Sequence, residues 1–425
     1  PIAVARIDPI LSPGQVGSHL HSFIGSDALA PTMDFAQTQT ASCSQVYVKP
    51  DKSSYWQPKL FFQDPNNKTF TIVPESHRVL YYQNRASDPE TGESDPSIIQ
   101  EFPEDFRMIA GDAMQRAPAE TEQLQNVIQW FCHGPDVQSS GFPNFTSCPD
   151  GLAASVQFPY CWNGDDIDIN NPSAHVSYPN NSAGNAAVDS GACPSTHPKI
   201  LPHIFIEFWF DTTSFDGLYT ESDSPWVLAQ GDPTGYGMHA DFLNGWETGV
   251  LENAMKNCDI GESGRPLSEC FDVYTDDERN ACSVGQLVNE DVSGWLDALP
   301  GCNPLQDGPS MAVMKTGCGD DATLAVGGLP SGWTSSGCYT DALTPRSLSG
   351  ITFAWWGEAM TSTGCANYCA NQGFSIAGTE NSSQCFCGNE LSGSQAVDSG
   401  KCDMTCDGED SQTCGGAAVL SVYSK

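Results

Sequence analysis

The sequence predicts a mainly β protein, with an antiparallel β-sandwich or jelly-roll-like core, long disulfide-tied loops and a small disulfide-rich C-terminal module. Short runs with a period of two recur through the first 260 residues. Helical spacing is rare by comparison. The chain of 425 residues also contains 18 cysteines among 40 glycines and 29 prolines. Many short strands joined by loops account for all three observations.

The clearest strand is predicted over residues 201–211, because its apolar residues alternate with polar or aromatic ones. One face carries only apolar side chains: Ile204, Ile206, Phe208 and Phe210. The opposite face carries His203, Phe205, Glu207, Trp209 and Asp211. Further strand signals lie at 44–73, 78–82, 107–110, 126–132 and 153–159, whereas helical spacing appears at 244–258 and 284–299.

The charge balance is strongly acidic, with 53 Asp and Glu against 17 Lys and Arg and a net charge of −36. Such a field repels nucleic acid and anionic membranes, so we expect neither as a partner. No apolar run is long enough to span a bilayer. The composition favours a neutral partner such as a polysaccharide.

Cysteine usage predicts a secreted protein, extracellular or associated with a cell wall. An even number of cysteines in a loop-rich chain indicates disulfides and an oxidising compartment. Four N-glycosylation sequons agree with this expectation, at Asn67, Asn144, Asn180 and Asn381.

The composition changes near residue 320, which predicts a domain boundary. Residues 320–335 are small and rich in Gly, Pro and Ser, as expected of a linker. Ten cysteines precede this stretch and eight follow it, so each part can close its own bridges. We therefore expect a large domain over 1–319, a linker over 320–335 and a small module over 336–425.

The small module contains the segments GCYTD, MTSTGCANYCANQGFSIAGTENSSQCFCGNEL and CDMTCDGEDSQTCGGAAVLSVY, which include Cys338, Cys365, Cys369, Cys385, Cys387, Cys402, Cys406 and Cys414. With these segments it resembles the WSC domain of fungal wall sensors and secreted enzymes. The resemblance implies four disulfides and binding to wall polysaccharides, whereas the alternative is a mere spacer. The aromatic candidates for sugar contact are Tyr339, Trp355, Trp356, Tyr368 and Phe386.

The large domain contains a series of distinctive segments that include RIDPILSPG, SHLHSFIG, FRMIAGD, FPYCWNGDDID and GDPTGYGMHADFLNGW, in this order. With these segments it resembles a secreted fungal family of unknown function, DUF1996, which often precedes a WSC domain. The family implies no chemistry, so the residues themselves must supply it.

Carboxylates beside aromatic rings favour a glycoside hydrolase acting on a cell-wall polysaccharide, with β-glucan as the first choice. In this hypothesis Glu207 donates the proton, and Asp241 or Asp232 from the glycine-rich loop 231–241 is its partner. His239 and His203 would orient the substrate or tune the acids, and no cofactor is required. Sugar stacking is assigned to Tyr55, Trp56, Trp209 and Trp246.

Two alternatives remain open. The first is a non-catalytic wall protein in which both domains bind glycan. The second is a metal-dependent oxidase or lyase with a divalent ion on His19, His21 and His239, because two histidines two residues apart project to one face of a strand. The competing interpretation of His19 and His21 is a hydrogen-bonded pair that lines a polar cleft.

Overall fold

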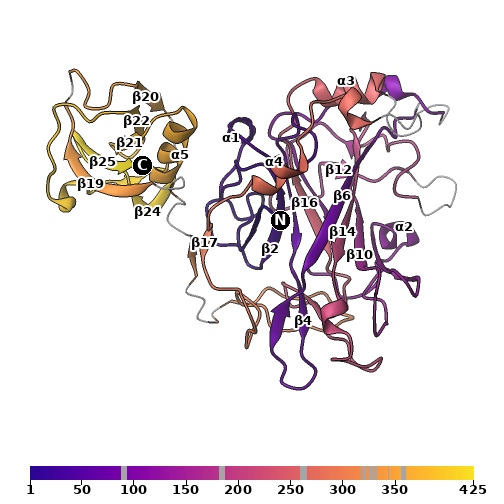
Figure 1. The fold of residues 1–425 in the computed structure, drawn as a ribbon. Coiled ribbons are helices and arrows are strands. Elements are labelled where there is room, and N and C mark those ends of the chain that lie inside the picture. Colours follow the sequence, from indigo (N-terminus) through magenta and orange to yellow (C-terminus); the bar gives the residue numbers. More distant parts are fainter. Residues whose placement is uncertain are drawn as a thin grey trace.

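Two five-stranded antiparallel sheets form the core of the larger part of the chain in the computed structural model (Figure 1). The structure describes residues 1–87, 93–180, 187–258, 266–316, 318, 322–324, 329, 333–342, 344–355 and 360–425. The first sheet has the order β1 (Ala3–Ala5), β2 (His21–Gly25), β3 (Ser54–Pro58), β16 (His239–Leu243) and β7 (Arg107–Gly111). The second has the order β6 (Glu75–Gln83), β14 (His203–Phe210), β10 (Leu152–Gln157), β8 (Ile128–Cys132) and β9 (Val137–Ser139). The predicted mainly β, antiparallel class is confirmed.

The two sheets face each other across one apolar core. From β14 the core receives Ile204, Ile206, Phe208 and Phe210, the face that the alternation predicted to be apolar. From the first sheet it receives Tyr55, Met108, Ala110, Ala240 and Phe242. Because side chains alternate across a strand, the neighbours of these residues point to the outer faces of the two sheets.

The outer face of the first sheet is itself covered. Phe23, Trp56 and Leu243 project from it into a second apolar cluster, which includes Ile7 and Ile10 of the N-terminal segment. The disulfide between Cys43 and Cys282 lies beside this cluster. The first sheet is therefore buried on both sides, as a near-continuous run of buried residues in β2, β3 and β16 confirms.

Smaller elements surround the two main sheets. The remaining strands of the large part are β4 (Leu60–Gln63), β5 (Phe70–Ile72), β11 (Cys161–Trp162), β12 (Val176–Ser177), β13 (Lys199–Ile200), β15 (Trp226–Leu228), β17 (Val288–Asn289) and β18 (Thr323–Leu324). Its helices are α1 (Phe35–Gln39), α2 (Glu122–Gln125), α3 (Val250–Asn257) and α4 (Asp276–Ala281), with short 3-10 turns at Pro96–Ile98, Thr213–Phe215 and Leu267–Glu269.

The two helix predictions had different outcomes. The helical spacing at 244–258 corresponds to α3, which buries Leu251 and Ala254. The prediction of a helix over 284–299 was wrong. There Val288 is buried in β17 and pairs with Leu324 of β18, while the other residues of the range form no helix.

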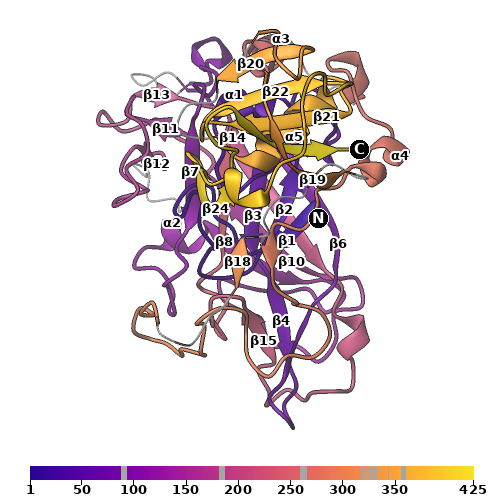
Figure 2. The ribbon, with the colours of Figure 1, turned by 90° about the vertical axis from the view of Figure 1, so that its left-hand side faces the viewer.

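The C-terminal part has a sheet and a helix of its own (Figure 1, orange and yellow; Figure 2). The sheet order is β19 (Thr334–Thr340), β25 (Val419–Ser424), β21 (Ile376–Glu380), β22 (Gln384–Gly388) and β20 (Ile351–Trp355). The helix α5 (Ser362–Asn371) contacts β21 and β22, and β23 (Thr405–Cys406) pairs with β24 (Glu409–Thr413). A 3-10 turn spans Ser399–Lys401.

All 18 cysteines form disulfides within their own part of the chain. In the large part the bridges are Cys43–Cys282, Cys132–Cys148, Cys161–Cys193, Cys258–Cys270 and Cys302–Cys318. In the C-terminal part they are Cys338–Cys402, Cys365–Cys385, Cys369–Cys387 and Cys406–Cys414. The exact borders at 319 and 336 stay a prediction, because much of the proposed linker lies outside the described residues.

Candidate metal centre

Three histidines meet on the covered, outer face of the first sheet. His21 begins β2, His239 begins β16, and His19 lies two residues before β2. His21 pairs with Pro58 of β3, and His239 pairs with Gly111 of β7. The outward direction of His239 follows from the alternation in β16, because Ala240 and Phe242 point into the core between the sheets.

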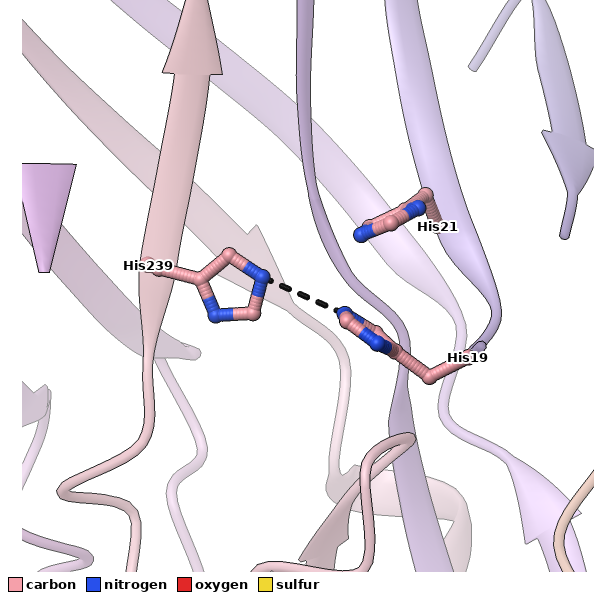
Figure 3. Close-up of side chains that lie close together, drawn as sticks. All are labelled: His19, His21 and His239. Carbon is pink, nitrogen blue, oxygen red and sulfur yellow. Dashed lines mark hydrogen bonds between the residues drawn. The ribbon is translucent and has the colours of Figure 1, made fainter. Parts of the chain in front are cut away.

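The three rings converge on one point (Figure 3). One nitrogen atom of each ring lies within 4.8 Å of the corresponding atoms of the other two. The Nε2 atoms of His19 and His239 are 3.2 Å apart. The ring centroids are 4.2 Å apart for His19 and His21, 5.2 Å for His19 and His239, and 6.0 Å for His21 and His239.

Backbone carbonyls fix the tautomers of two of the rings. The Nδ1 atom of His21 lies 2.9 Å from the carbonyl oxygen of Ile7, and that of His239 lies 2.9 Å from the carbonyl oxygen of Gly237. A carbonyl only accepts hydrogen bonds, so each Nδ1 must donate its proton and each Nε2 carries a lone pair in place of a proton. The Nε2 atom of His21 is buried and has no hydrogen-bond partner. Such an outer contact is what orients a metal-binding histidine.

Burial keeps the three imidazoles neutral. His19, His21 and His239 expose 7%, 1% and 4% of their surface. Desolvation lowers the pKa of His21 to about 4, and desolvation together with the nearby His21 lowers the pKa of His239 to about 4. The pKa of His19 is lowered well below its usual value, first by burial and then by His21 and His239. The neutral imidazole is the form that binds a metal ion.

Buried carboxyl groups accompany the histidines. The backbone N–H groups of Ile10 and Leu11 donate to the Oδ1 atom of Asp8. The Oδ2 atom of Asp241 is buried without a partner. Burial raises the pKa of Asp241 well above its usual value, and the charge of Asp8 raises it further. A divalent cation at the three histidines would offset the cost of burying negative charge here.

These residues fit a transition-metal ion better than calcium or magnesium. Imidazole nitrogen suits zinc, copper, iron and nickel, whereas calcium and magnesium prefer oxygen. Three protein ligands leave a coordination position for water or substrate, as in catalytic zinc sites. The three predicted metal ligands are thus brought together, from the segments SHLHSFIG and GDPTGYGMHADFLNGW.

The predicted carboxylate pair of a glycosidase does not form. Glu207 projects from β14 on the outer face of the second sheet, where it accepts a hydrogen bond from the hydroxyl group of Tyr81. Asp241 projects from β16 on the outer face of the first sheet and is 1% exposed. The apolar core between the sheets separates the two carboxyl groups, so they cannot flank one glycosidic bond.

Two other predicted site residues have structural contacts. Asp232 is fully buried, where it accepts hydrogen bonds from the backbone N–H groups of Thr234 and Gly237 and lies 3.5 Å from Arg116. His203 is also fully buried, with its Nδ1 atom 3.0 Å from the Oε1 atom of Gln83. Neither side chain is exposed at the surface.

The aromatic side chains predicted to stack on sugars in the large part are not available for stacking. Tyr55 and Trp56 expose none of their surface, and Trp246 exposes 6% and donates to the hydroxyl group of Tyr82. Trp209 is half-buried, and both its faces are occupied, because its ring stacks between those of His77 and His133 at centroid distances of 4.8 and 4.6 Å.

In the C-terminal part, the predicted contact residues differ in exposure. Tyr339 and Tyr368 are half-buried, so each keeps some surface for a ligand. Phe386 is 1% exposed and packs under the guanidinium group of Arg346, which corrects its assignment as a sugar contact. Trp356 and the side chain of Trp355 lie outside the described residues. The asparagines of the four sequons, Asn67, Asn144, Asn180 and Asn381, are all exposed.

Comparison with known families covers most of the chain. Residues 8–246, which include all three histidines, match a domain of unknown function, DUF1996. This chain belongs to the DUF1996 family. Residues 335–416 match the WSC domain, a carbohydrate-binding module. Both predicted resemblances are therefore confirmed, and neither match assigns a catalytic activity.

Three similar proteins match this chain over a length close to that of the WSC domain. A WSC domain-containing protein of Arthroderma benhamiae is 43% identical over 95 residues, which is 21% of this chain and 10% of that protein. A protein of Chaetomium globosum described as a putative fungistatic metabolite is 39% identical over 89 residues, or 20% of this chain and 40% of that protein. Human Kremen protein 2 is 35% identical over 89 residues, which is 20% of this chain and 19% of that protein. The chain thus covers less than half of each of these relatives.

Sequence reasoning missed the groups that orient the histidines. The carbonyl groups of Ile7 and Gly237 belong to the backbone, so the residue types at these positions do not reveal their role. The two residues lie in the segments RIDPILSPG and GDPTGYGMHADFLNGW. Asp8 was missed as well. An Arg-Ile-Asp-Pro run near two closely spaced histidines was the available signal.

Proposed function

We propose that this protein is a metal-dependent enzyme that acts on a neutral cell-wall polysaccharide and is held there by its WSC domain. The convergence of three neutral imidazoles, each near-buried and two of them oriented by backbone carbonyls, carries the proposal. A divalent transition-metal ion would be bound by His19, His21 and His239. The carbohydrate-binding module and the many disulfides fit an extracellular protein.

A metal ion with an open position supplies a Lewis acid and lowers the pKa of bound water. The chain's own residues provide the rest of the site. The carbonyl groups of Ile7 and Gly237 hold the imidazoles of His21 and His239 in position, and the carboxyl groups of Asp8 and Asp241 are buried nearby. The surrounding apolar cluster excludes bulk water.

The strongly acidic chain selects the substrate class. A net charge of −36 disfavours anionic chains such as polyuronates and nucleic acids. Neutral glucans, xylans and chitin remain, and β-glucan is the first substrate to test. Glycoside hydrolysis by two carboxylates is not part of this proposal, because Glu207 and Asp241 lie on opposite sides of the sandwich.

The test is product release from a panel of β-glucan, xylan and chitin, followed by mass spectrometry of the soluble products. Protein stripped with a chelator and reloaded separately with zinc, copper or manganese should release products with one of these metals. His239→Gln should release none, whereas His77→Gln, an exposed histidine outside the cluster, should behave as the native chain. Equal product release by chelated and reloaded protein would reject the proposal.

A second candidate is a non-catalytic glycan-binding protein with a structural metal ion. The low exposure of the three histidines favours it, because structural sites are closed to solvent. It predicts metal binding and retention on insoluble glucan without any soluble product. The same panel therefore separates the two functions.

A further inference from the structure

A cavity of about 350 Å³ lies beside the metal centre, on the far side of the edge strand β7. It is lined by β7, α2, β8, β12 and the loops next to them, which contribute both apolar and polar side chains. The polar part includes Asp112, Gln115, Gln125, Ser177, Tyr178 and Tyr236. Its volume falls in the range of small-molecule sites.

The cavity and the metal centre share one strand. Gly111 lines the cavity and pairs with His239 in the neighbouring strand. The next residue, Asp112, also lines the cavity. The cavity wall at Gly111 therefore lies about one strand spacing from the backbone of a proposed metal ligand.

The side chains that line the cavity favour a neutral ligand with many hydroxyl groups. No Lys, Arg or His side chain lines the cavity among the described residues, so it offers no counter-charge to an anion. Backbone carbonyls of Ala117 and Ala119 accept hydrogen bonds from the amide nitrogens of Gln115 and Gln125, which fixes both amide groups at the wall. Two tyrosine rings add the aromatic surface that sugar rings pack against.

We propose that this cavity binds a neutral sugar unit of the polysaccharide, with Asp112 accepting hydrogen bonds from the sugar hydroxyl groups. The inference rests on the proposed function for its substrate class, and it assigns to the DUF1996 domain a glycan site separate from the WSC domain. Asp112 is a binding residue in this assignment. The Oδ1 atom of Asp112 also accepts a hydrogen bond from the N–H group of Met114, which an asparagine would retain.

The experiment is hydrogen–deuterium exchange of the full chain with and without millimolar laminari-, cello-, xylo- or chito-oligosaccharides. Peptides from residues 107–128 report on the cavity, and peptides from 335–416 report on the WSC domain. Ala119→Trp places a large ring at the cavity wall, and Glu120→Trp is its matched control, since Glu120 is exposed and does not line the cavity. Asp112→Asn removes only the charge.

At least one of these sugars should protect residues 107–128 in the native chain and in Glu120→Trp. Ala119→Trp should abolish that protection, and Asp112→Asn should weaken sugar binding about tenfold, the difference between a charged and a neutral acceptor. Protection confined to 335–416, or protection of 107–128 that persists in Ala119→Trp, would overturn the inference. Metal content measured on the same samples separates the sugar-binding inference from the proposed function. If the cavity binds sugar but the protein binds no metal ion, the proposed metal centre is rejected and the sugar site is retained.

Discussion

The Nε2 atoms of His19 and His239 lie 3.2 Å apart, although 220 residues separate the two histidines in the chain. The contact brings together the beginning and the end of the region that matches DUF1996, residues 8–246. Two neutral imidazoles this close share one proton, and a metal ion can take its place. The DUF1996 fold thus assembles a site that no single segment contains.

Acid should destabilise the metal-free protein between about pH 6.5 and pH 4. Burial lowers the pKa of both His21 and His239 to about 4, so in this window the unfolded chain binds protons that the folded chain does not. The contribution of these two imidazoles to the free energy of unfolding is fully present above pH 6.5. It falls as the pH drops, by at most about 1.4 kcal/mol per pH unit for each imidazole. Urea unfolding of chelated protein at several pH values measures the slope, and His21→Gln should reduce it. An unchanged slope in that variant would contradict the burial of a neutral imidazole.

The carboxyl group of Asp241 should have the opposite effect on the pH dependence of stability: it stabilises the fold at low pH. Its pKa is raised by burial and by Asp8, so above the unfolded value near 3.9 the folded chain holds a proton that the unfolded chain has lost. That contribution to stability is present at low pH and declines as the pH rises towards the folded pKa. Asp241→Asn removes this decline in chelated protein. If native and variant proteins show the same pH dependence above pH 4, Asp241 is ionised in the fold.

Gly111 should be essential for the approach of β7 to His239. Its φ of +88° is costly for other residues, and an added Cβ would lie 2.4 Å from the carbonyl oxygen of Met238 and 2.9 Å from the Cα atom of His239. Gly111→Ala should therefore lower both the unfolding free energy and the metal affinity. Gly217→Ala is the matched control, because Gly217 has a φ of +78° with nothing within 4 Å of its Cβ position. That control should cost only the backbone strain, roughly 1–3 kcal/mol, with metal affinity unchanged. Equal losses in the two variants would mean that the close approach is unimportant.

Glu207→Gln should leave product release unchanged. Glu207 lies on the outer face of the second sheet, opposite the metal centre. The variant keeps a carbonyl oxygen that can accept the long hydrogen bond of 3.4 Å from Tyr81, so its thermal stability should change little. Loss of activity with retained fold would restore the two-carboxylate mechanism and reject the metal-dependent one.

The sequence alone predicted the strand pattern well but not the layers. The alternation in residues 201–211 correctly separated Phe208 and Phe210 from Glu207 and Trp209. It could not tell whether the polar face of β14 and the loop before β16 belong to one cleft, because that depends on which sheet each strand joins. They belong to different sheets, and this separates Glu207 from Asp241.

Burial of Trp56 shows a second limit of sequence analysis. In an isolated sandwich its side chain would be exposed on the outer face of the first sheet, where it could stack on a sugar. The N-terminal segment covers this face through Ile7 and Ile10, which no local pattern indicates. By contrast, the spacing of His19 and His21 was a local signal, and it indicated two of the three histidines that the fold brings together.

Metal stoichiometry tests the central claim most directly. The native chain, His21→Gln and the control His77→Gln are dialysed to equilibrium against a slight excess of zinc or copper and then analysed for metal per chain. The account predicts one ion per chain for the native protein and for His77→Gln, and far less than one for His21→Gln. No stoichiometric metal in the native chain, or equal metal in all three proteins, would contradict it.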